Sequence, residues 1–297
     1  MKTHFKGTFT ALVTPFASDG SIDGAALAAL MDFQIASGIE GIVIGGSTGE
    51  AATMSLEEKI SAAQIAVERS AGRVKIIVGT GTNDTRTSVK HTRAAKTAGA
   101  DGALVVTPYY NKPTETGLRA HFRAISDAAE DMPIILYNVP SRTAQNVGAA
   151  LQILVAEDCP NVVATKEASG NMEQIMEIIR DAPPHFSVLA GDDSAALPLI
   201  ACGAVGVVSV ISNYAPKVFG DCVRAALAAD FAESRRLHYR LFPLMKANFI
   251  ETNPIPVKTA LSLMGYCEEN YRLPLAPMQP ANKSFLAEVL RNCGILN

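Results

Sequence analysis

The chain has 297 residues, a net charge of −3 and no tryptophan, and apolar residues make up 48% of it. This composition is too apolar for a disordered chain, and it lacks the basic runs and aromatic platforms of a nucleic-acid-binding protein. The length fits either two ordinary domains or one α/β barrel with an appendage.

Eight apolar runs alternate with helical stretches from the start of the chain. They lie at 8–16, 41–46, 74–81, 102–110, 133–140, 162–168, 186–191 and 205–210. Each run is apolar on both faces, which is typical of parallel strands buried on two sides. Their starts are 19 to 33 residues apart, the spacing of βα units.

Capping residues predict the helices between these runs. Helices are expected to begin after Asp23, Ser55 and Asp84 and to end at Gly38, Gly72 and Gly99. Eight such units with right-handed crossovers predict a (β/α)8 TIM barrel of the α/β class. The alternative, an open doubly wound sheet, would need a GxGxxG turn that the sequence lacks.

The chain continues beyond the eighth predicted strand. A helix over 216–229 completes the last unit, and further helices are predicted at 231–250, 254–265 and 281–293. We therefore expect a catalytic barrel over 1–230 and a C-terminal helical appendage over 231–297.

Targeting signals and cysteine spacing indicate the compartment. No apolar span reaches about 18 residues and the first residues do not form a signal peptide, so a cytoplasmic protein with no membrane contact is expected. The five cysteines are odd in number and at least 20 residues apart, which predicts buried reduced thiols rather than disulfides or a CxxC metal site.

In a barrel the chemistry lies at the carboxyl ends of the strands, and Lys166 ends the sixth run. Burial in an apolar barrel mouth favours the neutral amine, which is the form that attacks a carbonyl and forms a Schiff base. The alternative is a lysine paired with Glu167 or with an aspartate of the seventh strand.

Tyr137 ends the fifth run on the face predicted to point into the barrel, where a phenol next to a lysine can carry protons. A core tyrosine with no catalytic role is the alternative. If the fourth strand continues through Tyr109 and Tyr110, only one of these tyrosines faces its own barrel.

Two further features suit carboxylate ligands. The loop GGSTGE offers backbone N–H groups and the hydroxyls of Ser47 and Thr48, although it is also a plausible tight turn. Arg142 is a cation near the barrel mouth, either for a carboxylate or for a surface salt bridge. No metal site is expected, because no histidine ends a strand, and Asp192 with Asp193 makes a poor Mg²⁺ site.

Six motifs occur in an order that resembles the dihydrodipicolinate synthase/N-acetylneuraminate lyase family of class I aldolase-like barrels. They are GGSTGE, GTGTN, TPYYNKP, YNVPSRT, TKEASGN and GDDS. Nearly the whole chain is covered, and TPYYNKP, YNVPSRT, TKEASGN and GDDS are more similar to the synthases than to the lyases. The resemblance implies condensation of pyruvate with L-aspartate 4-semialdehyde, with no cofactor, in a homo-oligomer that is a dimer of dimers.

The resemblance also implies a role for each site residue. Lys166 forms the imine with pyruvate, Tyr137 carries protons, and Tyr110 reaches the neighbouring subunit's site across a dimer interface. Ser47 links the two tyrosines into a relay. The remaining residues bind substrate: Thr48 holds the pyruvate carboxylate, Arg142 the carboxylate of the semialdehyde, and Gly191 and Val208 complete the substrate-binding set.

One departure keeps a second function open. The synthases usually have two threonines where this chain has Ser47 and Thr48, and GGSTGE is spelled more like the N-acetylneuraminate lyases. A sialic acid lyase or another pyruvate-dependent keto-sugar-acid lyase is therefore the main alternative, although the sialic acid enzymes lack an arginine placed like Arg142. A non-catalytic barrel is the third hypothesis.

The family's lysine-inhibited members carry a regulatory site that uses a serine, histidines and a glutamate. The matching positions here resemble Ala51, Leu56, Lys59 and Thr87. A cation at Lys59 repels the ammonium groups of lysine. We therefore expect feedback inhibition by lysine to be weak or absent.

Overall fold

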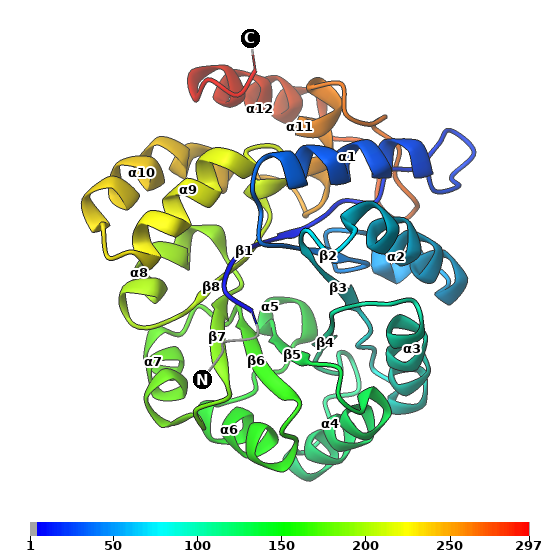
Figure 1. Cartoon of the computed structure of the whole chain (residues 1–297). Helices are drawn as coiled ribbons and strands as arrows, with labels where there is room; N and C mark the ends of the chain where they lie inside the picture. The colour runs from blue at the N-terminus through cyan, green and yellow to red at the C-terminus, as the bar shows by residue number, and fades with distance from the viewer. Residues whose placement is uncertain (1–4, 297) are drawn as a thin grey trace.

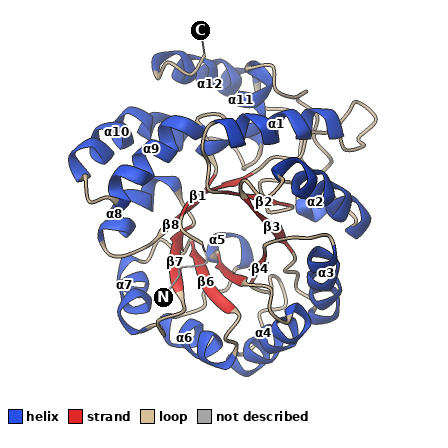
Figure 2. Cartoon of the chain, viewed as in Figure 1, coloured by secondary structure: helices blue, strands red, loops and turns tan. Residues whose placement is uncertain are grey.

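The computed structural model of the chain describes residues 5–296. Its eight parallel strands form a closed barrel in which each strand pairs with its neighbours in chain order (Figures 1 and 2). The strands are β1 (Gly7–Ala11), β2 (Gly41–Ile44), β3 (Lys75–Gly79), β4 (Gly102–Val106), β5 (Ile134–Asn138), β6 (Val162–Glu167), β7 (Ser187–Ala190) and β8 (Gly206–Ser209). The predicted TIM barrel is confirmed.

A ring of helices surrounds the barrel (Figure 2). These helices are α1 (Gly24–Ala36), α2 (Leu56–Ser70), α3 (Thr85–Thr97), α4 (Glu115–Ala129), α6 (Ala149–Asp158), α7 (Met172–Asp181), α8 (Ala196–Ala201) and α9 (Pro216–Leu227). The short helix α5 (Pro140–Thr143) instead lies within the circle of strands in this view. The predicted caps are confirmed, because the side chains of Asp23, Ser55 and Asp84 each accept a hydrogen bond from the first turn of their helix.

Every strand ends before the end of its apolar run, and the difference is largest for two of them. β1 ends at Ala11 rather than at residue 16, and β4 ends at Val106 rather than at residue 110. Pro15 and Pro108 lie in the excess segments, and proline has no N–H to donate to a strand ladder. Tyr110 has a φ of 72°, which also takes it out of extended backbone. The excess residues therefore form loops at the carboxyl end of the barrel.

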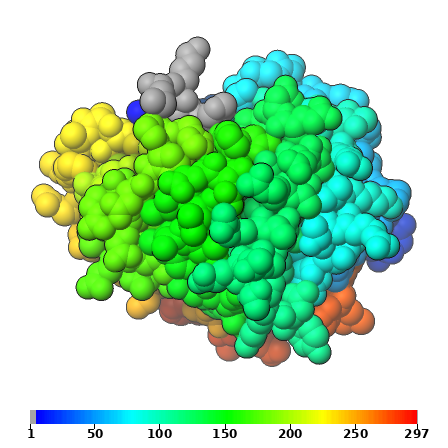
Figure 3. Space-filling model, turned by 90° about the horizontal axis from the view of Figure 1, so that it is seen from below, coloured from blue at the N-terminus to red at the C-terminus, as the bar shows by residue number. Residues whose placement is uncertain are grey.

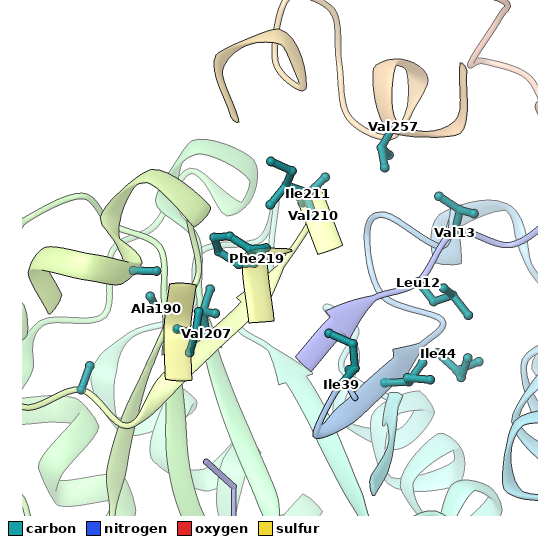
Figure 4. Close-up of a cluster of buried hydrophobic side chains, with 14 of the residues drawn as sticks. Leu12, Val13, Ile39, Ile44, Ala190, Val207, Val210, Ile211, Phe219 and Val257 are labelled. Carbon is teal, nitrogen blue, oxygen red and sulfur yellow. The ribbon is translucent and has the colours of Figure 1, made fainter. Parts of the chain in front are cut away.

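Alternation along the strands separates two apolar cores. Inside the barrel, Ile135 and Tyr137 of β5 pack with side chains from the other strands, while Ile134 and Leu136 face the helices. β8 behaves in the same way, with Val208 inside and Val207 outside. Figure 4 shows part of the outer core, where Val207 and Phe219 lie near one another between β8 and α9.

The helices after the barrel pack against its ring and its carboxyl end. α10 (Phe231–Ala247) packs on α9, and α12 (Pro280–Asn292) contacts both α10 and α11 (Ile255–Leu263). Val257 of α11 belongs to the outer core (Figure 4). Figure 3 shows these last residues, in orange and red, gathered at one end of the molecule.

Two expectations about the whole chain can be compared with the structure. No helix within the described residues is long and apolar enough to cross a membrane. The cysteines are free, but the prediction that all five are buried is wrong: Cys202, which follows the last turn of α8, is exposed, and Cys267 is half-buried.

Candidate active site

A cavity of about 310 Å³ opens at the carboxyl ends of the central strands, where the barrel architecture predicts the chemistry. The loop after β2 forms one wall, and Tyr137 and Arg142 from β5 and α5 form another. The third wall comes from the C-terminal segment, through residues 252–254 and 274–275. The cavity therefore lies between the barrel and the helices that follow it.

Lys166 and Tyr137 lie at paired positions of neighbouring strands, β6 and β5. Both side chains are buried, and the Lys166 Nζ lies 4.1 Å from the centroid of the Tyr137 ring. Tyr137 lines the cavity, whereas Lys166 lies beside it rather than among the lining residues. Within residues 5–296 no carboxylate forms an ion pair with Lys166, so the alternative of a salt-bridged lysine does not hold.

The loop after β2 places the hydroxyls of Ser47 and Thr48. The turn requires glycine, because Gly45 has a φ of 63° and a Cβ on Gly79 would lie 2.1 Å from the Gly45 carbonyl oxygen. Ser47 lines the cavity, and Thr48 is buried behind it. The side-chain amide of Asn253 donates a hydrogen bond to the Thr48 Oγ1 at 3.0 Å, which leaves the Thr48 hydroxyl proton free to donate.

Arg142 lies in the short helix α5 and lines the cavity. Its Nη2 donates to the backbone oxygen of Asn253 at 3.1 Å. No carboxylate among the described residues forms an ion pair with Arg142. The alternative that the sequence left open, a surface salt bridge at this arginine, therefore does not hold. Its guanidinium retains donors for a ligand carboxylate.

Tyr109 and Tyr110 lie in different environments, as alternation along a strand would predict, although both residues are in a loop and not in a continued strand. Tyr109 lines the cavity of its own barrel. Tyr110 is 89% exposed and does not line that cavity. The chain thus brings Ser47 and Tyr137 to one cavity and leaves Tyr110 on the surface.

Gly191 and Val208 have packing roles in the structure. A Cβ on Gly191 would lie 2.6 Å from that of Ala168, and the Gly191 N–H donates to the Glu167 backbone oxygen at 2.8 Å. Val208 is buried in the inner core of the barrel. Neither residue lines the cavity.

Asp192 and Asp193, which follow β7, accept hydrogen bonds from backbone N–H groups. Asp192 accepts a hydrogen bond from the Ser194 N–H, and the buried Asp193 accepts from the N–H groups of Val210 and Ile211. Burial raises the pKa of Asp193 to about 6. Over residues 5–296 no group of three or more His, Cys, Asp or Glu side chains is placed to hold a metal ion; His4 lies outside this range.

Two of the four regulatory positions adjoin the same cavity. Ala51 and Lys59 line it, and the Thr87 side chain instead bonds to Asp84 at the start of α3. Lys59 is buried and has no ion-pair partner in the described part of the chain, and burial lowers its pKa. Leu56 is the first residue of α2.

Sequence reasoning missed Asn253, which contacts both Thr48 and Arg142. The residue lies 205 positions from Thr48, between the helices predicted at 231–250 and 254–265. An asparagine that precedes a proline carries no signal of such a contact. Only the packing of the C-terminal segment over the barrel brings it there.

The fold and the site are those of a TIM-barrel lyase with a lysine at the carboxyl end of its sixth strand. Residues 4–293 match the model of the dihydrodipicolinate synthetase family, and the chain belongs to that family.

Several relatives are similar over nearly their whole length. The 4-hydroxy-tetrahydrodipicolinate synthase of Aquifex aeolicus is 48% identical, with 97% of each chain covered. The enzyme of the same name from Nitratidesulfovibrio vulgaris is 49% identical, with 98% of this chain and 99% of the relative covered.

Solved structures agree with this assignment. The crystal structure of dihydrodipicolinate synthase from Aquifex aeolicus superposes with a TM-score of 0.96 at 47% identity and covers 98% of this chain and 99% of that one. The dihydrodipicolinate synthase of Thermotoga maritima gives a TM-score of 0.96 at 40% identity, with 99% and 100% covered.

Proposed function

We propose that the chain condenses pyruvate with L-aspartate 4-semialdehyde to give 4-hydroxy-tetrahydrodipicolinate, a step of lysine and diaminopimelate biosynthesis in the cytoplasm. The observation that carries this proposal is the buried Lys166 side chain, which has no carboxylate partner within residues 5–296 and whose Nζ lies 4.1 Å from the Tyr137 ring centroid. Family membership and the named relatives favour this substrate pair over the sugar acids of the lyases.

The reaction begins with attack of the neutral Lys166 amine on the pyruvate C2 carbonyl. Loss of water gives a protonated imine, which withdraws electrons so that a methyl proton leaves C3 and an enamine forms. C3 then attacks the aldehyde carbon of the semialdehyde, and the aldehyde oxygen takes a proton to become a hydroxyl. The amine of the new product attacks C2, releases Lys166 and closes the ring.

The surrounding groups supply binding and proton transfer. The Thr48 hydroxyl donates a hydrogen bond to the pyruvate carboxylate. The backbone N–H groups of Ser47 and Thr48 donate to the same carboxylate, since neither N–H has a hydrogen-bond partner among the described residues. Arg142 binds the carboxylate of the semialdehyde. Protons pass along Tyr137, Ser47 and the partner subunit's copy of Tyr110.

Borohydride reduction in the presence of pyruvate tests the chemistry. A stable adduct is expected on the peptide that contains Lys166, with loss of activity, and Lys166→Arg should abolish both. Lys75→Arg is the matched control, because Lys75 lies at the opposite end of the barrel and pairs with Asp101. Cleavage of N-acetylneuraminate without condensation of aspartate semialdehyde would favour the lyase alternative, and absence of any imine would favour a non-catalytic barrel.

We further propose an active dimer, assembled into a tetramer, in which Tyr110 serves the neighbouring site. Its support is the 89% exposure of a tyrosine next to the cavity-lining Tyr109. Co-expression of Tyr110→Phe with Lys166→Ala tests it. If Tyr110 acts across the interface, mixed dimers hold one intact site each, and about a quarter of wild-type activity returns. If Tyr110 acts within its own chain, no intact site forms and activity stays at the level of the single variants.

A further inference from the structure

A second set of polar residues lies on the outer face of β5 and β6, directly behind the reactive pair. Asn138 follows Tyr137 and Glu167 follows Lys166, and in each case the two side chains leave opposite faces of the strand. Asn138 and Glu167 are themselves paired across the two strands, and both are buried, with 0% and 1% of their surface exposed.

Glu167 is surrounded by neutral donors. Its Oε2 accepts hydrogen bonds from the side-chain amides of Gln152 in α6 and Gln174 in α7, at 2.7 and 3.3 Å. Its Oε1 accepts from the Ser169 N–H at 2.7 Å. In the part of the chain that the structure describes, no lysine, arginine or histidine pairs with it. Since every partner donates, the network is complete only with an ionised carboxylate.

Asn138 joins this carboxylate to the neighbouring elements. Its amide nitrogen lies 3.1 Å from each oxygen of Glu167 and 2.9 Å from the Oδ1 of Asn146. Its own Oδ1 accepts from the Val147 N–H at 3.1 Å. These contacts fix the β5–β6 register where Tyr137 and Lys166 lie. They also fix the segment that follows α5, the helix carrying Arg142.

We propose that Glu167 and Asn138 are positioning residues that hold Lys166 and Tyr137 in register, and that the Glu167 carboxylate stabilises the protonated imine through the barrel wall. The inference rests on the proposed function, because it assigns a charge to serve the imine. A buried carboxylate with no paired cation acts over longer distances than an exposed one, since little solvent screens it.

Positioning and charge have separate consequences. Misplacing a reactive group by a fraction of an ångström slows the chemical step more than it weakens binding. The negative charge of Glu167 favours the protonated forms of the Lys166 amine and of its imine. Without that charge, the part of the pH–rate profile that reflects loss of the amine proton should move to lower pH. Glu167→Gln removes the charge, whereas Asn138→Ala keeps the charge and removes the link between the strands.

The experiment compares these two variants with Gln34→Met. Gln34 is a matched control because it is equally buried, bonds to Thr10 of β1 and to the Ser212 oxygen, and lies across the barrel from β5 and β6. The measurements are the rate of imine formation with pyruvate, by borohydride trapping, and kcat and KM over a range of pH. Thermal unfolding shows that each variant folds.

We expect Glu167→Gln to slow imine formation and kcat by about tenfold to a hundredfold. Its KM for pyruvate should change by no more than about threefold, and the profile should move toward acid. Asn138→Ala should slow kcat by about tenfold without that shift.

Wild-type rates and profiles in both variants, or equal losses in Gln34→Met, would overturn the inference. If Glu167→Gln does not fold, a wild-type rate in Asn138→Ala still overturns the positioning role. A wild-type protein that forms no imine would instead contradict the proposed function itself.

Discussion

Asn253 offers a sharp test of how the C-terminal segment serves the site. Its side chain donates one hydrogen bond, to the Thr48 Oγ1 at 3.0 Å, and its Oδ1 is buried without a partner. Its backbone oxygen, which accepts from Arg142, survives substitution. Asn253→Ala therefore frees the Thr48 hydroxyl to rotate and leaves the Arg142 contact in place.

The expected effects on stability and on binding differ. A lost neutral hydrogen bond costs about 1 kcal/mol, but the substitution also removes a buried carbonyl oxygen without a partner, so the free energy of unfolding should fall by less than about 1 kcal/mol. Loss of an oriented donor to the pyruvate carboxylate should raise the KM for pyruvate by about fivefold, the equivalent of ~1 kcal/mol. The KM for the semialdehyde should not change, because Arg142 remains bonded.

Steady-state kinetics with each substrate varied, alongside urea unfolding, measures these effects. Asn248→Ala is the matched control. Asn248 is buried in the same segment, accepts one hydrogen bond from the Tyr214 hydroxyl at 3.0 Å, and has an unpartnered Nδ2, so it should lose similar stability without a change in KM. A KM for pyruvate within twofold of wild type in Asn253→Ala, or an equal rise in the control, would refute the reasoning.

Three further predictions concern charged groups. The Arg272 guanidinium lowers the pKa of Glu58 to about 2, so the contribution of Glu58 to stability is present above pH 4.5 and is lost as the pH falls toward 2. Because the pair is partly exposed, Glu58→Gln should lower the free energy of unfolding at pH 7 by only about 1 kcal/mol and flatten its acid dependence, and an unchanged acid slope in urea unfolding would contradict this. Lys258→Met leaves the buried Glu50 without its cation and should lower the free energy of unfolding by about 3–5 kcal/mol in the same assay. The double variant with Glu50→Gln should recover part of this loss, and an equal loss in both variants would count against the pairing. Lysine at micromolar concentration should not inhibit the wild-type enzyme in a steady-state assay, because Lys59 repels its ammonium groups, and clear inhibition would show the opposite.

The sequence predicted the barrel and its reactive residues because both depend on local periodicity. Apolar runs at βα spacing define eight strands, and a strand's alternation places Tyr137 inside the barrel. Lys166 follows from its position at the end of such a run. The ends of β1 and β4 were wrong because apolar composition continues into loops that proline and a positive φ exclude from the sheet.

Contacts between segments that are distant in the sequence could not be predicted from local periodicity. Asn253 reaches Thr48 only because the C-terminal segment packs over the barrel mouth. The partners of Glu167 come from α6 and α7, whose faces sequence periodicity orients only coarsely. A side chain's partner depends on tertiary packing, whereas its face on a strand depends on parity alone.

The three lysines that are buried within residues 5–296 show why position identifies a nucleophile better than burial does. Lys258 is fully buried but bonds to Glu50, so its ammonium serves the packing of the C-terminal segment. Lys59 is buried and has no ion-pair partner among the described residues, yet it lies on α2 and not at a strand end. Of these three lysines, Lys166 alone combines burial and freedom from a carboxylate with a tyrosine ring 4.1 Å away at the carboxyl end of the barrel. A direct ion pair would hold the Lys166 ammonium in its protonated form. Glu167 lies on the opposite face of β6 and, within residues 5–296, forms no ion pair with Lys166, which is the arrangement that its proposed role requires.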